Sequence, residues 1–158
     1  MKMRLTVTGE KEVQAEIARM SVRYPGAFAA ALYSEGVGIY NEARNRVPVD
    51  SGYLRDSAYV TKPNPKAQNI SLEVGFGAEH ASLQHQKTEY RHTQGQAKYL
   101  QNTMEKLSPG FLQRLATATQ KNVAAGIETV TAAVPSRKGS RLRGRASRAS
   151  RAVGAKRR

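Results

Sequence analysis

The spacing of apolar residues predicts short strands and helices along most of the chain. Residues 27–46 give the clearest pattern, because Phe28, Leu32, Ile39 and Tyr40 fall on one helical stripe. The predicted elements are, in chain order, a strand over residues 3–8, a helix over 10–20, a long helix over 27–46, one helical turn over 53–57, strands over 58–62, 70–76 and 81–86, and helices over 97–107 and 109–130.

The long helix carries two glycines and ends before a proline. Gly36 lies on the apolar stripe and Gly38 lies off it. A glycine on the stripe predicts that another backbone or a partner helix packs closely there, because glycine otherwise costs about 1 kcal/mol relative to Ala. Pro48 disfavours helical backbone at Val47 and is expected to end the helix.

Strict alternation over residues 70–76 predicts the best strand in the chain, with one buried face. At the other end, Ser108 followed by Pro109 predicts the N-cap and first position of the last helix. The expected fold class is α+β. We expect a small antiparallel sheet of about three to four strands, packed against the long helix and the C-terminal helices.

Residues 48–52 form a predicted structural turn between the long helix and the sheet. Asp50 and Ser51 are expected to accept backbone N–H groups, while Gly52 permits a positive φ and Pro48 fixes the entry of the chain. This turn is expected to set the angle between helix and sheet. Asp56, just beyond the turn, is expected to cap a helix or to pair with Arg55.

Charge divides the 158 residues into a body and an arm. The chain has 26 Lys and Arg against 12 Asp and Glu, a formal charge of +14. Residues 1–135 are expected to form one domain with a modest positive charge, and residues 136–158 a flexible basic arm without acidic residues. The basic residues of the arm are Arg137, Lys138, Arg141, Arg143, Arg145, Arg148, Arg151, Lys156, Arg157 and Arg158.

Composition excludes several classes of protein. The chain contains no Cys, which removes disulfide scaffolds, Cys-ligated metal sites and thiol nucleophiles. Apolar runs are too short to span a bilayer, and the start does not resemble a signal peptide. His80, His85 and His92 lie near one another without a known metal spacing. We therefore expect no enzyme, no cofactor and no metal.

Several motifs in fixed order resemble one family. Residues 47–57 read V-P-V-D-S-G-Y-L-R-D-S and resemble the V-P-V-D-T-G-x-L-R-x-S segment of small tailed-bacteriophage neck proteins. These are head–tail joining or tail-completion proteins, also described as minor tail or minor capsid components. A long helix precedes this segment. A strand ending V-G-F-G-A-E at 74–79, a His- and Tyr-rich loop at 84–92 and a G-Q-A-K-Y-L run at 95–100 follow it.

The resemblance covers residues 1–135 and implies a structural virion protein. Family members form homo-oligomeric rings, typically of six copies, which join the portal or its adaptor to the tail and continue the DNA channel. The implied partners are further copies of the chain, portal, adaptor or other neck proteins, tail or tail-terminator proteins, and viral DNA contacted without sequence preference, with no membrane. The implied location is the virion neck, reached from the host cytoplasm during assembly.

Within that picture, the loop over residues 84–95 is expected to contact an adjacent subunit or ring. Glu89 and Arg91 are candidate ion-pair partners, and an interface of this kind needs about 1,000 Å² or more, so helix or sheet-edge surface must contribute as well. The candidate interface residues are Arg55, His85, Glu89, Tyr90, Arg91 and His92.

The basic arm has two interpretations besides that of a solvated tail. It contacts nucleic-acid phosphates, or it contacts an acidic protein surface. Six copies would bring about sixty cations to a channel in which about 30 Å of duplex holds about 18 phosphates, and such a clamp would hinder DNA exit. Protein contact is therefore the favoured interpretation. The alternative function is a small basic nucleic-acid-binding protein that uses this arm.

Overall fold

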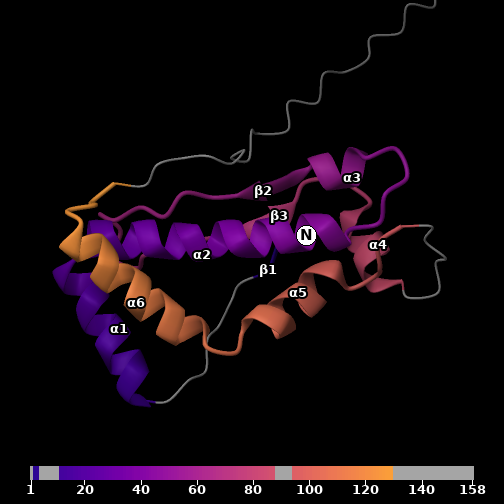
Figure 1. Ribbon diagram of the computed structural model, residues 1–158. Helices are drawn as coiled ribbons and strands as arrows, with labels where there is room; N and C mark the ends of the chain where they lie inside the picture. Colours follow the sequence, from indigo (N-terminus) through magenta and orange to yellow (C-terminus); the bar gives the residue numbers. More distant parts are fainter. Residues whose placement is uncertain (1, 4–10, 88–93, 130–158) are drawn as a thin grey trace, which may run out of the picture.

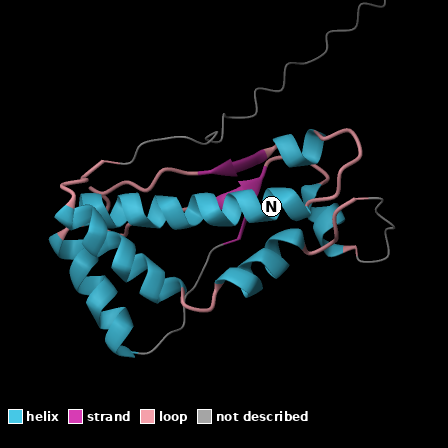
Figure 2. Cartoon of the chain, viewed as in Figure 1, coloured by secondary structure: helices cyan, strands magenta, loops and turns pink. Residues whose placement is uncertain are grey.

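The computed structural model describes residues 2–3, 11–87 and 94–129 (Figures 1 and 2). Over these residues the chain is mainly helical, with six helices and a small antiparallel sheet. The elements are β1 (Lys2–Met3), α1 (Lys11–Arg23), α2 (Pro25–Arg46), α3 (Tyr53–Asp56), β2 (Ala58–Val60), β3 (Val74–Phe76), α4 (Ala81–Gln86), α5 (Tyr99–Leu107) and α6 (Phe111–Ala124). The expected small sheet beside a long helix and C-terminal helices is confirmed, but helix dominates.

Helix α2 is the central element of the fold. Pro25 stands at its start, where the missing N–H costs nothing. Val47 is extended (φ −64°, ψ 141°), so the helix ends before Pro48 as predicted. Helices α1, α5 and α6 pack along one side of α2, and β2 and β3 lie on the other (Figure 1).

Gly36 allows the segment before β3 to approach α2. A Cβ at Gly36 would lie 2.5 Å from Cδ1 of Leu72 and 2.7 Å from its Cδ2. Nothing lies within 4 Å of such an atom at Gly38. The predicted close approach at Gly36 is therefore confirmed, although a side chain provides the contact instead of another backbone or a partner helix.

The sheet has the order β1-β3-β2, with β3 in the middle. Both pairs are antiparallel; Ala58 lies opposite Phe76 in one pair and Lys2 opposite Gly75 in the other. The predicted strand over residues 70–76 is shorter than expected. Thr61 N still donates to the Glu73 carbonyl oxygen at 2.8 Å, but the partner segment then reaches Pro63, which has no N–H to continue the ladder.

The strand predicted over residues 81–86 is wrong, because this segment forms helix α4. After β3 the chain leaves the sheet: Ala81 N donates to the Ala78 carbonyl oxygen at 3.0 Å, and Gln84 N to that of His80 at 3.0 Å. These short-range bonds wind the backbone into a helix. The strand that completes the sheet is β1, from the other end of the described chain.

The helix predicted to begin at Pro109 starts later and ends earlier. Ser108 continues the helical backbone of α5, and Gly110 turns the chain with φ +68° before α6. Ser108 is therefore not an N-cap; its hydroxyl donates to the Glu105 carbonyl oxygen at 3.2 Å. Helix α6 ends at Ala124, and Gly126 follows with φ +66°. Gly126 N donates to the Val123 carbonyl oxygen and Ile127 N to that of Asn122, a pair of bonds that commonly ends a helix.

The centre of the core lies where α5 meets β3 and α4. Tyr99 and Leu100 are fully buried. The Tyr99 ring meets Phe76 edge-on with centroids 4.9 Å apart, and its hydroxyl donates to the Ala81 carbonyl oxygen at 3.0 Å. Burial raises the pKa of Tyr99, so the hydroxyl stays protonated as a donor. This contact fixes α4 against the sheet.

Candidate interaction surfaces

The structure brings together two segments that lie far apart in the sequence. Val49 N donates to the Gln94 carbonyl oxygen at 3.3 Å, and Gln96 N donates to that of Arg46 at 2.9 Å. Gly95 stands between these bonds with φ +86°, and a Cβ there would overlap the backbone of Val47 and Pro48. The 47–57 segment and the G-Q-A-K-Y-L run are therefore parts of one backbone junction.

The predicted structural turn lies beside this junction. Pro48 is buried, whereas Asp50 and Ser51 are exposed. Ser51 Oγ accepts a long bond from Tyr53 N at 3.4 Å, and Gly52 has φ +81° as predicted. The turn passes directly into α3, so it positions a single helical turn between α2 and β2.

Arg55 and Asp56 lie exposed on α3. Asp56 Oδ1 accepts from the Arg44 guanidinium at 3.1 Å, whereas Arg55 Nε is 3.8 Å away. The main partner of Asp56 is thus an arginine on α2, twelve residues earlier, and not the adjacent arginine that the sequence indicated. The Arg55 side chain remains accessible at this end of the molecule, as an interface residue requires.

His85 does not lie in a projecting loop. It belongs to α4, and its side chain is buried, 8% exposed, against Tyr99 with ring centroids 5.1 Å apart. Its Nε2 accepts from Gln101 N at 3.4 Å. Burial, with a smaller effect from the charge of Lys98, lowers the pKa of His85. The assignment of His85 to a subunit interface is therefore corrected: it is a core residue.

The remaining predicted interface residues belong to parts of the chain that the structure does not describe. Glu89, Tyr90, Arg91 and His92 lie outside the described residues, as does the whole basic arm from Arg137 to Arg158. Their roles stay predictions.

Ion pairs attach the C-terminal helices to α2. Glu42 accepts from Lys106 Nζ at 2.7 Å and from Arg46 Nε at 2.9 Å, and Glu35 accepts from Arg114 Nε at 3.1 Å. The hydrogen bonds from Lys106 and Arg46 lower the pKa of Glu42. Two of these pairs join residues 64 and 79 positions apart, so charge spacing along the chain could not reveal them.

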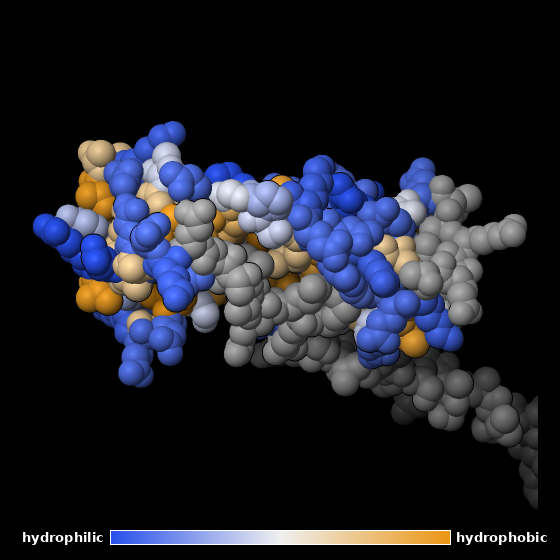
Figure 3. Space-filling view, turned by 90° about the horizontal axis from the view of Figure 1, so that it is seen from below, coloured by the Kyte–Doolittle hydropathy of each residue, from blue (hydrophilic) through white to orange (hydrophobic). Residues whose placement is uncertain are grey.

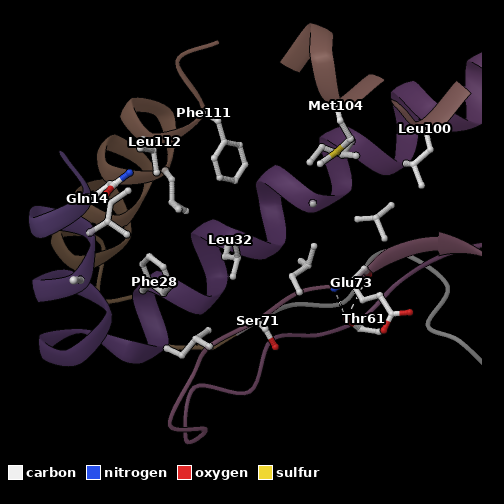
Figure 4. Close-up of a pocket in the computed structure, with 18 residues that line it drawn as sticks. Gln14, Phe28, Leu32, Thr61, Ser71, Glu73, Leu100, Met104, Phe111 and Leu112 are labelled. Atoms are coloured by element: carbon white, nitrogen blue, oxygen red, sulfur yellow. Dashed lines mark hydrogen bonds between the residues drawn. The ribbon is translucent and has the colours of Figure 1, made fainter. Parts of the chain in front are cut away.

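An apolar groove of about 630 Å³ runs between α2, the C-terminal helices and the segment before β3 (Figure 4). Phe28, Leu32 and Met104 point into it from two of these helices, α2 and α5. At its polar side, Glu73 N donates to Thr61 Oγ1 at 2.8 Å. Because carbon atoms form most of its wall, the groove suits apolar side chains and offers no set of acid, base and nucleophile among the residues that line it.

Large apolar side chains are exposed at both ends of the molecule. Val22 is 83% exposed, Tyr24 37% and Ile127 43%, and all three belong to the end formed by α1, α6 and the start of α2. Figure 3 shows apolar surface gathered at this end. Tyr53 and Leu83, 59% and 55% exposed, belong to α3 and α4. The apolar pattern of the sequence did not single out these residues, although Val22 and Leu83 each stand between polar neighbours.

The described residues hold neither a metal-ligand cluster nor a membrane-spanning helix. Across residues 11–87 and 94–129, no three His, Asp or Glu side chains come together as metal ligands would. In the same part of the chain, no helix combines the length and apolar character needed to cross a bilayer.

Comparisons of the chain with protein-family models, with curated proteins and with solved structures find no match. The functional interpretation therefore depends on the motifs, the fold and the surfaces described above.

Proposed function

We propose that the chain is a structural protein of a tailed-bacteriophage neck, without catalytic activity. It forms a ring of identical copies, six in our proposal, that joins the portal or its adaptor to the tail and surrounds the DNA channel. Its partners are copies of itself, the neighbouring neck and tail proteins, and DNA that passes through without base-specific contact. Its place is the junction of capsid and tail in the virion.

The backbone junction between residues 46–49 and 94–96 is the observation that carries this proposal. The two motifs with the closest resemblance to neck proteins meet there through Val49 N to Gln94 O and Gln96 N to Arg46 O. Backbone-to-backbone bonds of this kind hold a surface in shape and perform no chemistry. In a catalytic site, polar side chains from the two motifs would instead point toward one another. Here Pro48 is buried and Asp50 is exposed.

Deletion of the gene from the viral genome that encodes the chain tests the proposal. A neck protein that joins capsid and tail is needed for that joining, so we expect DNA-filled capsids and separate tails by electron microscopy. Supplying the intact chain from a plasmid should restore complete particles. Complete, infectious particles without the chain would contradict the proposal.

A chain that lacks residues 136–158 tests the arm. If the arm docks on an acidic protein surface, the shortened chain should fail to restore joined particles. Normal joining would refute an essential docking role while leaving the ring proposal in place.

The alternative function is nucleic-acid binding through the arm. The only observation that favours it is the presence of ten basic residues in the arm. It predicts that the full chain shifts duplex DNA of any sequence at low salt and that residues 1–135 do not. It also predicts that deleting the gene leaves joined particles, which separates it from the neck proposal.

A further inference from the structure

The segment just before β3 forms one wall of the apolar groove (Figure 4). Ile70 and Leu72 line the groove, alternate with polar residues and pack against the core, but both stay partly exposed. Val74, the next apolar residue, lies opposite Met3 of β1 and is buried, 6% exposed. The groove therefore adjoins the point at which the described pairing with β1 ends.

β1 lies along one edge of β3, and β2 lies along the other. On the β2 edge the pairing continues past the start of β3, since Thr61 N donates to the Glu73 carbonyl oxygen at 2.8 Å. On the β1 edge, Lys2 lies opposite Gly75 and Met3 opposite Val74 in an antiparallel register. If the chain continues in this register beyond Met3, it follows residues 73 to 70 along the wall of the groove.

Continued in this way, the register sets apolar residues opposite apolar ones and polar residues opposite polar ones. The opposite pairs are Arg4 with Glu73, Leu5 with Leu72, Thr6 with Ser71, and Val7 with Ile70. Because opposite residues share a face of the sheet, Leu5 and Val7 fall on the apolar face that lines the groove. A slip of one residue would bring polar side chains there instead.

The length of chain between β1 and α1 fits this path. Residues 4–10 join the two elements and lie outside the described residues. Both ends of this connection are attached at the groove, because Met3 is paired with Val74 and Ile17 of α1 lines the groove. From residue 7 to the start of α1 the chain can span at most about 14 Å. So short a connection favours the groove of the same chain over that of a second copy.

We propose that residues 4–7 occupy the groove of their own chain as a continuation of β1, with Leu5 and Val7 against its apolar wall. The contact removes apolar surface of both the segment and the groove from water, and it sets Arg4 beside Glu73. The occupant of the groove is then this segment and not a ligand or a partner protein. The inference does not rest on the neck proposal, because the purified chain alone decides it.

A pair of cysteines on the polar face tests the register and leaves the apolar contacts intact. The chain has no Cys of its own, so Thr6→Cys combined with Ser71→Cys introduces the only two thiols. Residues directly opposite in an antiparallel pair have Cα atoms about 4.5–5.5 Å apart, which is within the range of a disulfide. In a glutathione redox buffer we expect a disulfide within one chain, identified by mass spectrometry of its peptides.

Thr6→Cys combined with Asn69→Cys is the matched control. Asn69 is exposed like Ser71. In the proposed register it is a diagonal neighbour of residue 6, with Cα atoms about 7–8 Å apart, so its disulfide should form at least about tenfold more slowly. Equal rates for the two variants, or no disulfide in either, would overturn the proposed register. A disulfide that joins two chains, seen as a dimer on a non-reducing gel, would overturn the assignment to the same chain.

Removing the two apolar side chains tests their place in the groove. Leu5→Ala combined with Val7→Ala should expose the groove and increase the fluorescence of the apolar dye 1-anilinonaphthalene-8-sulfonate above that seen with the unaltered chain. Arg4→Ala combined with Thr6→Ala changes the polar face and should leave the dye signal as it is. A cooperative urea transition checks that each variant is folded. Equal dye fluorescence from all three chains would overturn the inference, and if the apolar variant does not fold, the cysteine pairs still decide it.

Discussion

The Cα atom of Gly95 lies directly against the carbonyl group of Val47, with no room for a side chain between them. Gly95 also has φ +86°, a conformation that residues with a Cβ rarely adopt. Two independent constraints therefore require glycine at this position. They arise where the 94–96 segment bonds to the end of α2, so this junction depends on glycine at position 95.

Gly95→Ala should lower the free energy of unfolding by about 3 kcal/mol, the sum of backbone strain and overlap with Val47. Gly126→Ala is the matched control, because Gly126 has φ +66° but a Cβ at this position would meet nothing within 4 Å. It should lose only about 1 kcal/mol. Urea unfolding measures both. Equal losses would mean that contact with Val47 adds nothing.

Gly36→Ala should stabilise the chain less than Gly38→Ala. The gain in helix propensity is about 1 kcal/mol at both positions, but at Gly36 the end of the Leu72 side chain must first move aside. The same change at Gly38, which has open space around it, should stabilise α2 by up to about 1 kcal/mol. Thermal or urea unfolding of the two variants measures the difference.

A double-mutant cycle tests whether Leu72 causes the difference between the two positions. In a Leu72→Ala background there is room for the new methyl group, so Gly36→Ala should become as stabilising as Gly38→Ala. An effect of the same size in both backgrounds would contradict the close contact seen between Gly36 and Leu72.

Glu42→Gln should reduce stability at pH 7 by less than about 1 kcal/mol, because the Glu42 side chain and its partners are partly solvated. The lowered pKa of Glu42 means that the contribution is present above the ordinary value of 4.5 and is lost as pH falls through the lowered pKa. The difference between Glu42→Gln and the unaltered chain in urea unfolding should therefore shrink toward pH 3. A difference that grows below pH 4.5 would contradict this assignment.

His85 should make the fold less stable in mild acid. Its pKa is lowered in the folded chain, so below its ordinary value of 6.5 the unfolded chain binds more protons. Stability, measured by urea unfolding, is then lost as pH falls from about 7 toward 5. His85→Gln should flatten this slope. A slope that is the same in His85→Gln and in the unaltered chain would show that His85 is not the responsible group.

Local sequence signals predicted the elements whose ends are fixed by local chemistry. Pro48 ends α2 as predicted, because it disfavours helical backbone at Val47. The start was predicted two residues late, at residue 27, although Pro25 at the first helical position is itself a local signal. Gly52 takes the positive φ that its turn demanded. These features depend on a few consecutive residues, and the sequence displays those residues directly.

Elements decided by distant contacts were not predictable in the same way. Residues 81–86 are too few to distinguish a helix from a strand by periodicity. Their helix is fixed by Tyr99, whose hydroxyl bonds the Ala81 carbonyl group from 18 positions away. The burial of His85 has the same origin, because Tyr99 packs against its ring. His85 is therefore a core residue although its neighbours in the sequence are polar.

The same difference between local and distant contacts decides which exposed residues could be predicted. Arg55 is exposed on the element where the sequence placed it. The exposure of Val22 and Ile127 was not predicted from the sequence, because it depends on how α1 and α6 pack around the start of α2. Exposure is a property of the folded chain, and periodicity alone does not reveal it.

A cryo-electron microscopy reconstruction of the phage particle in which we propose that the chain resides tests the central claim most directly. We predict a closed ring of copies around the DNA channel between capsid and tail. A junction built without this chain, or a solitary copy bound elsewhere in the particle, would contradict the account.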